Sequence, residues 1–159
     1  MRVIAVEAHP ENYKALCRNV ECNNFKNIKT VSKAVSDTKG VVTMYKQSDT
    51  PRSRSGQYTS LLNALVTSNR TPCEVKCDTL DDIIGNEGAD LMKLDIEGAE
   101  VLALKGATSS LKRLRKIIVE VHGDNFEKVR HILEMHEFKL EFMTSTKSEG
   151  MSYIIGSKT

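Results

Sequence analysis

The stretch that decides the fold is Lys-Leu-Asp-Ile-Glu-Gly-Ala-Glu, residues 93–100. It closes an apolar run that begins at Ala89, and it places the carboxylates of Asp95 and Glu97 at the end of that run. Gly98 then supplies a turn, and a helical pattern of apolar residues starts at Glu100. A buried strand that ends in carboxylates and turns into a helix is typical of the ligand-binding edge of an α/β enzyme. The alternative is a capped helix alone, because acidic residues favour the first turn of any helix.

Length and composition indicate one ordinary globular domain. The 159 residues are 40% hydrophobic and 28% charged, with a net charge of +2, so residues 1–159 are expected to form a single domain with one core. No global basic field favours a nucleic-acid partner. No apolar run reaches the length of a membrane span and no signal-like segment opens the chain. We therefore expect a cytoplasmic protein with neither a nucleic-acid nor a membrane partner.

The cysteines and histidines do not form a recognised ligand pattern. The four cysteines contain no Cys-x-x-Cys pair, and the four histidines contain no His-Glu-x-x-His motif. The sequence therefore predicts reduced, mostly buried thiols and no metal site. The cysteines are Cys17, Cys22, Cys73 and Cys77.

Hydrophobic periodicity predicts alternating strands and helices. The expected strands are residues 2–6, 28–35, 40–45, 74–77, 89–95, 116–121, 138–143 and 152–155. The expected helices are residues 10–22, 79–84, 99–111 and 125–137. We expect strands 28–35 and 40–45 to form a hairpin or an edge extension, and the last two strands to form an antiparallel hairpin. Parallel βα units closed by such a hairpin describe a three-layer α/β sandwich.

Polar residues stand at the ends of two further strands, and one long connection separates the halves of the chain. Glu7 ends the first strand, while Glu120 and His122 alternate at the end of another, so their side chains share one face. Residues 47–71 are rich in Ser, Thr, Asn and Arg and are expected to form a long excursion rather than a separate domain.

Several segments in order resemble the FkbM-type methyltransferases. Residues 2–12 resemble the second strand and helix of that family, and residues 93–100 resemble its second hallmark. The resemblance also covers residues 34–36, 60–63, 78–81 and 119–122. It implies a Rossmann-like three-layer α/β/α methyltransferase fold, S-adenosylmethionine as cofactor, and O-methylation of a sugar or another small-molecule acceptor.

The resemblance assigns roles residue by residue. Glu7 matches the acid that accepts hydrogen bonds from the ribose of the cofactor, with an exposed turn acid as its alternative. His9 of the same motif is assigned to the cofactor site with it. Asp95 matches a position beside the methionine moiety or the substrate hydroxyl, as a cofactor contact and as a catalytic residue that orients or serves as a proton acceptor. Glu97 has a similar catalytic claim, with a helix-start acid as its alternative.

Glu120 and His122 are the expected substrate contacts. They are either binding groups or an acid–base pair in which His122 is catalytic, and the alternative for His122 is a structural hydrogen bond. Residues 60–63 either close over the cofactor or pack through Leu61 and Leu62.

The chain departs from the family pattern at one point. Family members carry a strand, a Gly-rich turn and a helix before the segment that resembles residues 2–12, and no Gly-x-Gly-x-x-Gly occurs in this sequence. We therefore expect a domain without that first strand–helix unit, whose strand lies between the strands ending in Glu7 and Asp95 in this fold. Residues 2–6 are then expected either to pair directly with residues 91–95 or to exchange with another chain, as in a homodimer.

Two functions of different classes remain open from the sequence. The first is a small-molecule O-methyltransferase, which the retained Glu7 and Asp95 favour. The second is a non-catalytic methyltransferase-fold remnant that acts as a binding module through exposed sheet edges. Nucleic-acid methylation lacks support, because no Asn/Asp-Pro-Pro-Tyr motif and no basic face are present.

Overall fold

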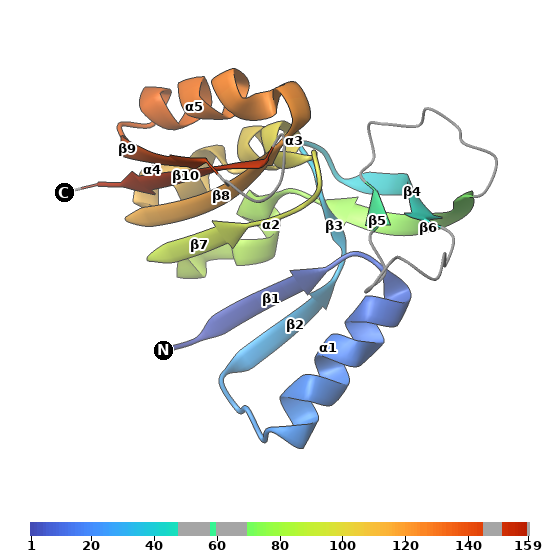
Figure 1. The fold of residues 1–159 in the computed structure, drawn as a ribbon. Helices are drawn as coiled ribbons and strands as arrows, with labels where there is room; N and C mark the ends of the chain where they lie inside the picture. Colours follow the sequence, from blue (N-terminus) through green and yellow to red (C-terminus); the bar gives the residue numbers. More distant parts are fainter. Residues whose placement is uncertain (48–57, 60–69, 145–150, 159) are drawn as a thin grey trace.

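The computed structural model describes residues 1–47, 58–59, 70–144 and 151–158. Within these ranges the chain forms three sheets with their helices (Figure 1). The expected excursion at residues 47–71, including residues 60–63, lies mostly outside the described residues, as does the turn of the last hairpin. None of the described helices is long and apolar enough to cross a bilayer.

The first unit is a strand–helix–strand segment. β1 (Val3–Glu7) pairs in parallel with β2 (Ile28–Ser32), and α1 (Pro10–Cys22) connects them. Pro10 suits the first turn of α1 because its missing N–H has no partner there. The predicted strand, the predicted helix and its end at Asn23 are confirmed.

The second sheet carries the strand of the deciding stretch. Its order is β7 (Leu91–Leu94), β8 (Lys116–His122), β10 (Met151–Ser157) and β9 (Lys139–Thr144). β7 and β8 are parallel, whereas β10 is antiparallel to both β8 and β9. Parallel units closed by an antiparallel pair are therefore confirmed.

The third sheet differs from the expected hairpin. Its order is β3 (Ala34–Val35), β6 (Arg70–Asp78), β4 (Gly40–Gln47) and β5 (Tyr58–Thr59). The predicted strand 28–35 is broken at Lys33 into β2 and β3, which belong to different sheets. The predicted hairpin is wrong, because β6 lies between β3 and β4 and takes the hydrogen bonds of both.

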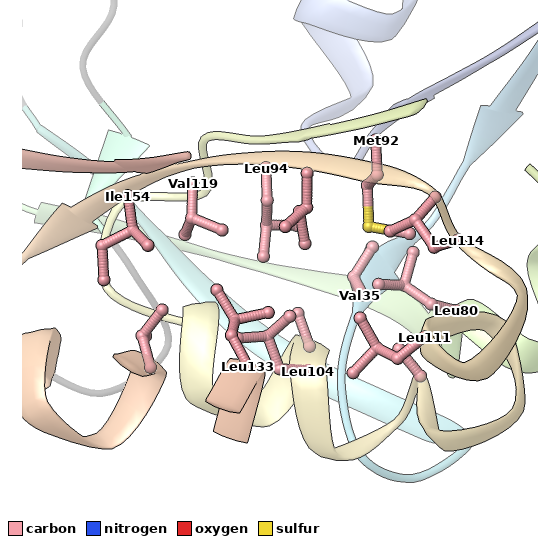
Figure 2. Packing of buried hydrophobic residues seen from close by; sticks show 14 of the residues in the cluster. Val35, Leu80, Met92, Leu94, Leu104, Leu111, Leu114, Val119, Leu133 and Ile154 are labelled. Carbon is pink, nitrogen blue, oxygen red and sulfur yellow. The ribbon is translucent and has the colours of Figure 1, made fainter. Parts of the chain in front are cut away.

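The main core lies between the second sheet and four helices. These helices are α2 (Leu80–Ile84), α3 (Glu100–Lys105), α4 (Thr108–Arg113) and α5 (Phe126–Met135). Figure 2 shows the strand side chains Met92, Leu94 and Val119 directed toward helix side chains such as Leu104 and Leu133. Along β8 the odd-numbered residues from Ile117 to Val121 are buried, which leaves the alternate face of the strand for polar groups.

Two smaller expectations, on a helix and on the cysteines, are corrected. The predicted helix 99–111 is two helices, because the chain breaks at Gly106 and Ala107 to pack closely against the backbone at Ser36. Thr79 caps α2, since its hydroxyl accepts a hydrogen bond from the Asp82 N–H. All four cysteines are free, but only Cys77 is buried, so the prediction of mostly buried thiols is wrong.

β1 and β7 each have an edge without a strand partner in the described part of the chain. The predicted direct pairing of residues 2–6 with residues 91–95 is wrong, because β1 is hydrogen-bonded only to β2 and β7 only to β8. A cleft of ≈1540 Å³ separates the two strands, and side chains of both line it. Figure 1 shows the arrows of β1 and β7 pointing in a similar direction.

An ion pair joins the linker after β2 to the third sheet, and it makes stability depend on pH. The Lys33 ammonium hydrogen-bonds to the buried Asp78 carboxylate, and this bond holds the pKa of Asp78 below its ordinary value of 3.8 against the opposing effect of burial. A lowered folded-state pKa stabilises the fold above the ordinary pKa, and this stabilisation is lost as the pH falls through the folded value.

We therefore expect Asp78→Asn to be less stable than the wild type near neutral pH. The difference in free energy of unfolding should shrink well below pH 3.8, where the wild-type carboxyl is also protonated. Urea unfolding of the wild type and of Asp78→Asn, at neutral pH and at a pH well below 3.8, measures this difference in free energy of unfolding. A difference that stays constant with pH would contradict the assigned role of the ion pair.

Candidate active site

Polar side chains gather where β7 and β8 end. Asp95 follows β7 directly, and Glu120 and His122 occupy alternate positions at the end of β8. Because these strands are parallel neighbours, their carboxyl ends meet at one edge of the sheet. The predicted shared face of Glu120 and His122 is confirmed, since His122 Nε2 lies 3.7 Å from Glu120 Oε1.

The turn after Asp95 has a strained backbone. Glu97 has a φ of 51° and Gly98 a φ of 103°. The left-handed region costs a non-glycine residue about 1–2 kcal/mol, so Glu97 is held there by its surroundings. The turn brings Glu97 Oε2 to 3.5 Å from His122 Nε2.

A buried carboxylate fixes the orientation of His122. Glu100 is 0% exposed, and its Oε1 accepts a hydrogen bond of 2.7 Å from the Gly98 N–H and lies 2.9 Å from His122 Nδ1. The Asn125 amide donates to Glu100 Oε2 at 2.8 Å and to the Gly98 carbonyl at 2.9 Å. The hydrogen bond to Glu100 places a hydrogen on Nδ1 and turns Nε2 toward the other carboxylates of the site.

His122 Nε2 faces the carboxylates of the site. The atom is shielded from solvent and has no hydrogen-bond partner within the described ranges. One ligand atom each of Asp95, Glu97 and His122 lies within 4.8 Å of the others. Burial raises the pKa of the Glu97 carboxyl, the neighbouring His122 opposes that effect, and the nearby Asp95 and Glu120 add to it.

Two further groups border the carboxylates. Lys93 Nζ lies 2.9 Å from Asp95 Oδ2, and this hydrogen bond raises the pKa of the lysine. Tyr153 of β10 is directly opposite Glu120 in the strand register, and its pKa is raised by burial and by hydrogen bonding to that carboxylate. The edge thus combines acceptors, one ammonium group and one phenol.

Sequence reasoning missed four of these residues, which are Lys93, Glu100, Asn125 and Tyr153. Alternation along a strand places Lys93 on the same face as Asp95, so that signal was present in the sequence. The others reach the site through helix packing and strand register, which the local pattern does not encode.

Glu7 and His9 have different surroundings. Glu7 lines the cleft between β1 and β7 together with Asp95 and Glu97, and its Oε1 accepts a hydrogen bond of 2.8 Å from the His9 N–H. His9 is buried and caps α1, since its Nδ1 accepts from the Glu11 N–H at 3.3 Å. His9 is not one of the described residues that line the cleft. The structure therefore brings Glu7 and Asp95 to one cleft and gives His9 a local capping contact.

Comparisons with solved structures show the fold. Methyltransferase FkbM from Methylobacillus flagellatus KT is similar with a TM-score of 0.66 and 19% identity, over 98% of this chain and 36% of that chain. The METTL16 MTase domain is similar with a TM-score of 0.54 and 14% identity, over 98% of this chain and 50% of that chain. Precorrin-6y C5,15-methyltransferase from Geobacter metallireducens GS-15 is similar with a TM-score of 0.53 and 16% identity, over 99% of this chain and 66% of that chain. The chain spans less than two thirds of each, and the expected Rossmann-like methyltransferase fold is confirmed.

Sequence comparison agrees with the fold. No curated protein shows a significant match to this sequence. The family model described as the methyltransferase FkbM domain matches residues 1–149. The chain, with its acidic strand ends in a methyltransferase fold, therefore belongs to the FkbM methyltransferase domain family.

Proposed function

We propose that the chain is an S-adenosylmethionine-dependent methyltransferase domain that methylates a hydroxyl of a sugar or another small metabolite. One observation carries the proposal: Glu7 and Asp95, at the carboxyl ends of two strands, line the same cleft. Ligands of open α/β sheets bind at this edge. The cleft extends along both strands, and Glu7 and Asp95 border it at their carboxyl ends.

Glu7 suits the ribose of the cofactor. Its carboxylate offers several lone pairs, of which the His9 N–H uses one, so acceptors remain for two ribose hydroxyls. Its side chain stands at the end of β1, on the border of the cleft. When bound, S-adenosylmethionine supplies the methyl group that is transferred.

The residues after β7 and β8 suit the acceptor. Asp95 Oδ2 accepts a hydrogen bond from Lys93, and the remaining lone pairs of the carboxylate can hold a hydroxyl and receive its proton. Glu120 and His122 offer further acceptors on the same edge. The main contribution of the protein is to position the hydroxyl, because methyl transfer depends largely on proximity and alignment.

Calorimetric titration with S-adenosylmethionine and S-adenosylhomocysteine tests the proposal. We expect a dissociation constant in the micromolar range, about −8 kcal/mol. Glu7→Ala should weaken binding about tenfold to a hundredfold, because hydrogen bonds to a charged group contribute about 1.5–3 kcal/mol. Glu21→Ala, the same change on an exposed position of α1, is the matched control and should leave binding unchanged.

The open strand edges support a second function. Unpaired edges on β1 and β7 are suited to accept a strand from another chain, either in a homodimer or from a different partner. Absence of detectable heat at millimolar cofactor, together with a dimer in analytical ultracentrifugation, would favour this binding module. Unchanged binding in Glu7→Ala would instead move the cofactor site away from β1.

A further inference from the structure

We infer that Asp95, Glu97 and His122 form a binding site for a divalent metal cation of the kind that includes Mn²⁺ and Mg²⁺. No sequence motif predicts this site, because the three ligands come from the ends of two strands and from a turn. Their ligand atoms lie within 4.8 Å of one another. A cation between them needs only small side-chain movements to reach the roughly 2.0–2.1 Å of a magnesium–ligand bond.

The surroundings of His122 Nε2 point to a cation. Its nearest charged atoms are carboxylate oxygens, at 3.5 Å from Glu97 and 3.7 Å from Glu120. Both distances exceed those of a normal N–H···O hydrogen bond, and the shielded nitrogen has no such partner in the described residues. The carboxylates around Nε2 repel one another unless a positive charge lies among them, and a metal cation bound through this nitrogen supplies that charge as a proton would.

The imidazole is held as metal-binding histidines are held. Its other nitrogen bonds to the fully buried Glu100, which the Asn125 amide fixes in turn. Such a carboxylate–histidine pair orients the free nitrogen and increases its basicity toward a metal. Asp95 and Glu97 are more exposed, so they can adjust to the ion.

The set of donors determines the class of cation. Two carboxylate oxygens and one imidazole nitrogen suit Mn²⁺, and Mg²⁺ more weakly, rather than a soft thiolate-binding metal. Three protein ligands leave positions for water or for an acceptor hydroxyl. There the cation would lower the pKa of the hydroxyl. This role rests on the proposed function, whereas binding of the cation does not.

Mn²⁺ titration followed by electron paramagnetic resonance tests the site without cofactor or substrate. The full chain, treated first with a chelator, should remove one equivalent of Mn²⁺ from the free-ion signal. Electron spin-echo modulation should show coupling to one ¹⁴N nucleus. His122→Gln should lose that coupling and bind at least about tenfold more weakly. His131→Gln, on an exposed position of α5, should behave as the wild type.

A second variant keeps the test decisive if His122→Gln disturbs the fold. Glu97→Gln changes an exposed turn residue outside the Glu100 network and should also weaken Mn²⁺ binding. Binding that is absent below millimolar Mn²⁺, or unchanged affinity and coupling in the variants, would overturn the inference. Such a result would not change the cofactor binding that calorimetry measures, so the metal site and the methyltransferase function can be rejected independently of each other.

Discussion

Glu100→Ala is expected to lower the free energy of unfolding by about 3 kcal/mol, because a polar group left buried without a hydrogen bond costs about 1–3 kcal/mol. The substitution leaves His122 Nδ1, the Asn125 amide and the Gly98 N–H without their acceptor. Each of these donors is partly buried and would lose a hydrogen bond, although the Asn125 amide keeps its bond to the Gly98 carbonyl. Because His122 then loses its fixed orientation, Mn²⁺ binding should weaken as well.

Urea unfolding at neutral pH measures this effect. Glu127→Ala on α5 is the matched control, since its exposed carboxylate only pairs with Arg130 at 3.4 Å. An exposed pair of this kind contributes about 0.5 kcal/mol or less. Glu100→Gln keeps one acceptor oxygen, so its loss of unfolding free energy should lie between those of Glu100→Ala and Glu127→Ala. A loss in Glu100→Ala no greater than in Glu127→Ala would show that the buried network does not stabilise the fold.

Gly106→Ala is expected to destabilise the protein by about 3 kcal/mol, at the upper end for inserting a methyl group into a packed site. The new Cβ would overlap the backbone carbonyl oxygen of Ser36 and lie 3.2 Å from Asp37 Cα. Both are backbone atoms, so no flexible side chain can yield. The joint between α3 and α4 would have to move away from the loop after β3.

Gly40→Ala provides the control for this prediction. Its Cβ would meet only the Cys77 sulfur, at an ordinary 3.9 Å. Thermal unfolding of the two variants should therefore show a large decrease in melting temperature for Gly106→Ala and little change for Gly40→Ala. Equal stability of the two would contradict the close approach of the α3–α4 joint to Ser36.

The sequence predicted the elements whose signals are local. Apolar runs ending in Asp95 and Glu7 gave the strands and their polar ends, and alternation placed Glu120 with His122. The helix break at Gly106 was not predictable, because it depends on a distant backbone segment.

Long-range pairing limited the rest of the prediction. β3 and β4 are neighbours in sequence, but each finds a better partner in β6, which arrives much later in the chain. Tyr153 reaches Glu120 only through the register of β10 against β8. Glu100 has the sequence signal of an ordinary first-turn acid, and its burial follows from the packing of α3.

The separate pairing of β1 with β2 has a consequence for local unfolding. α1 contains no buried residue, and no residue of β1 is fully buried, whereas β8 and β10 contribute side chains that are 0% exposed. Amide hydrogens of β1 and α1 should therefore exchange through local opening, and those of β8 only through global unfolding. Glu7 belongs to the unit of β1 and α1 that opens locally, whereas Asp95 follows β7, which pairs with the stable strand β8. A ligand that bridges them would slow exchange mainly in β1 and α1, because its binding energy is then coupled to the closing of that unit.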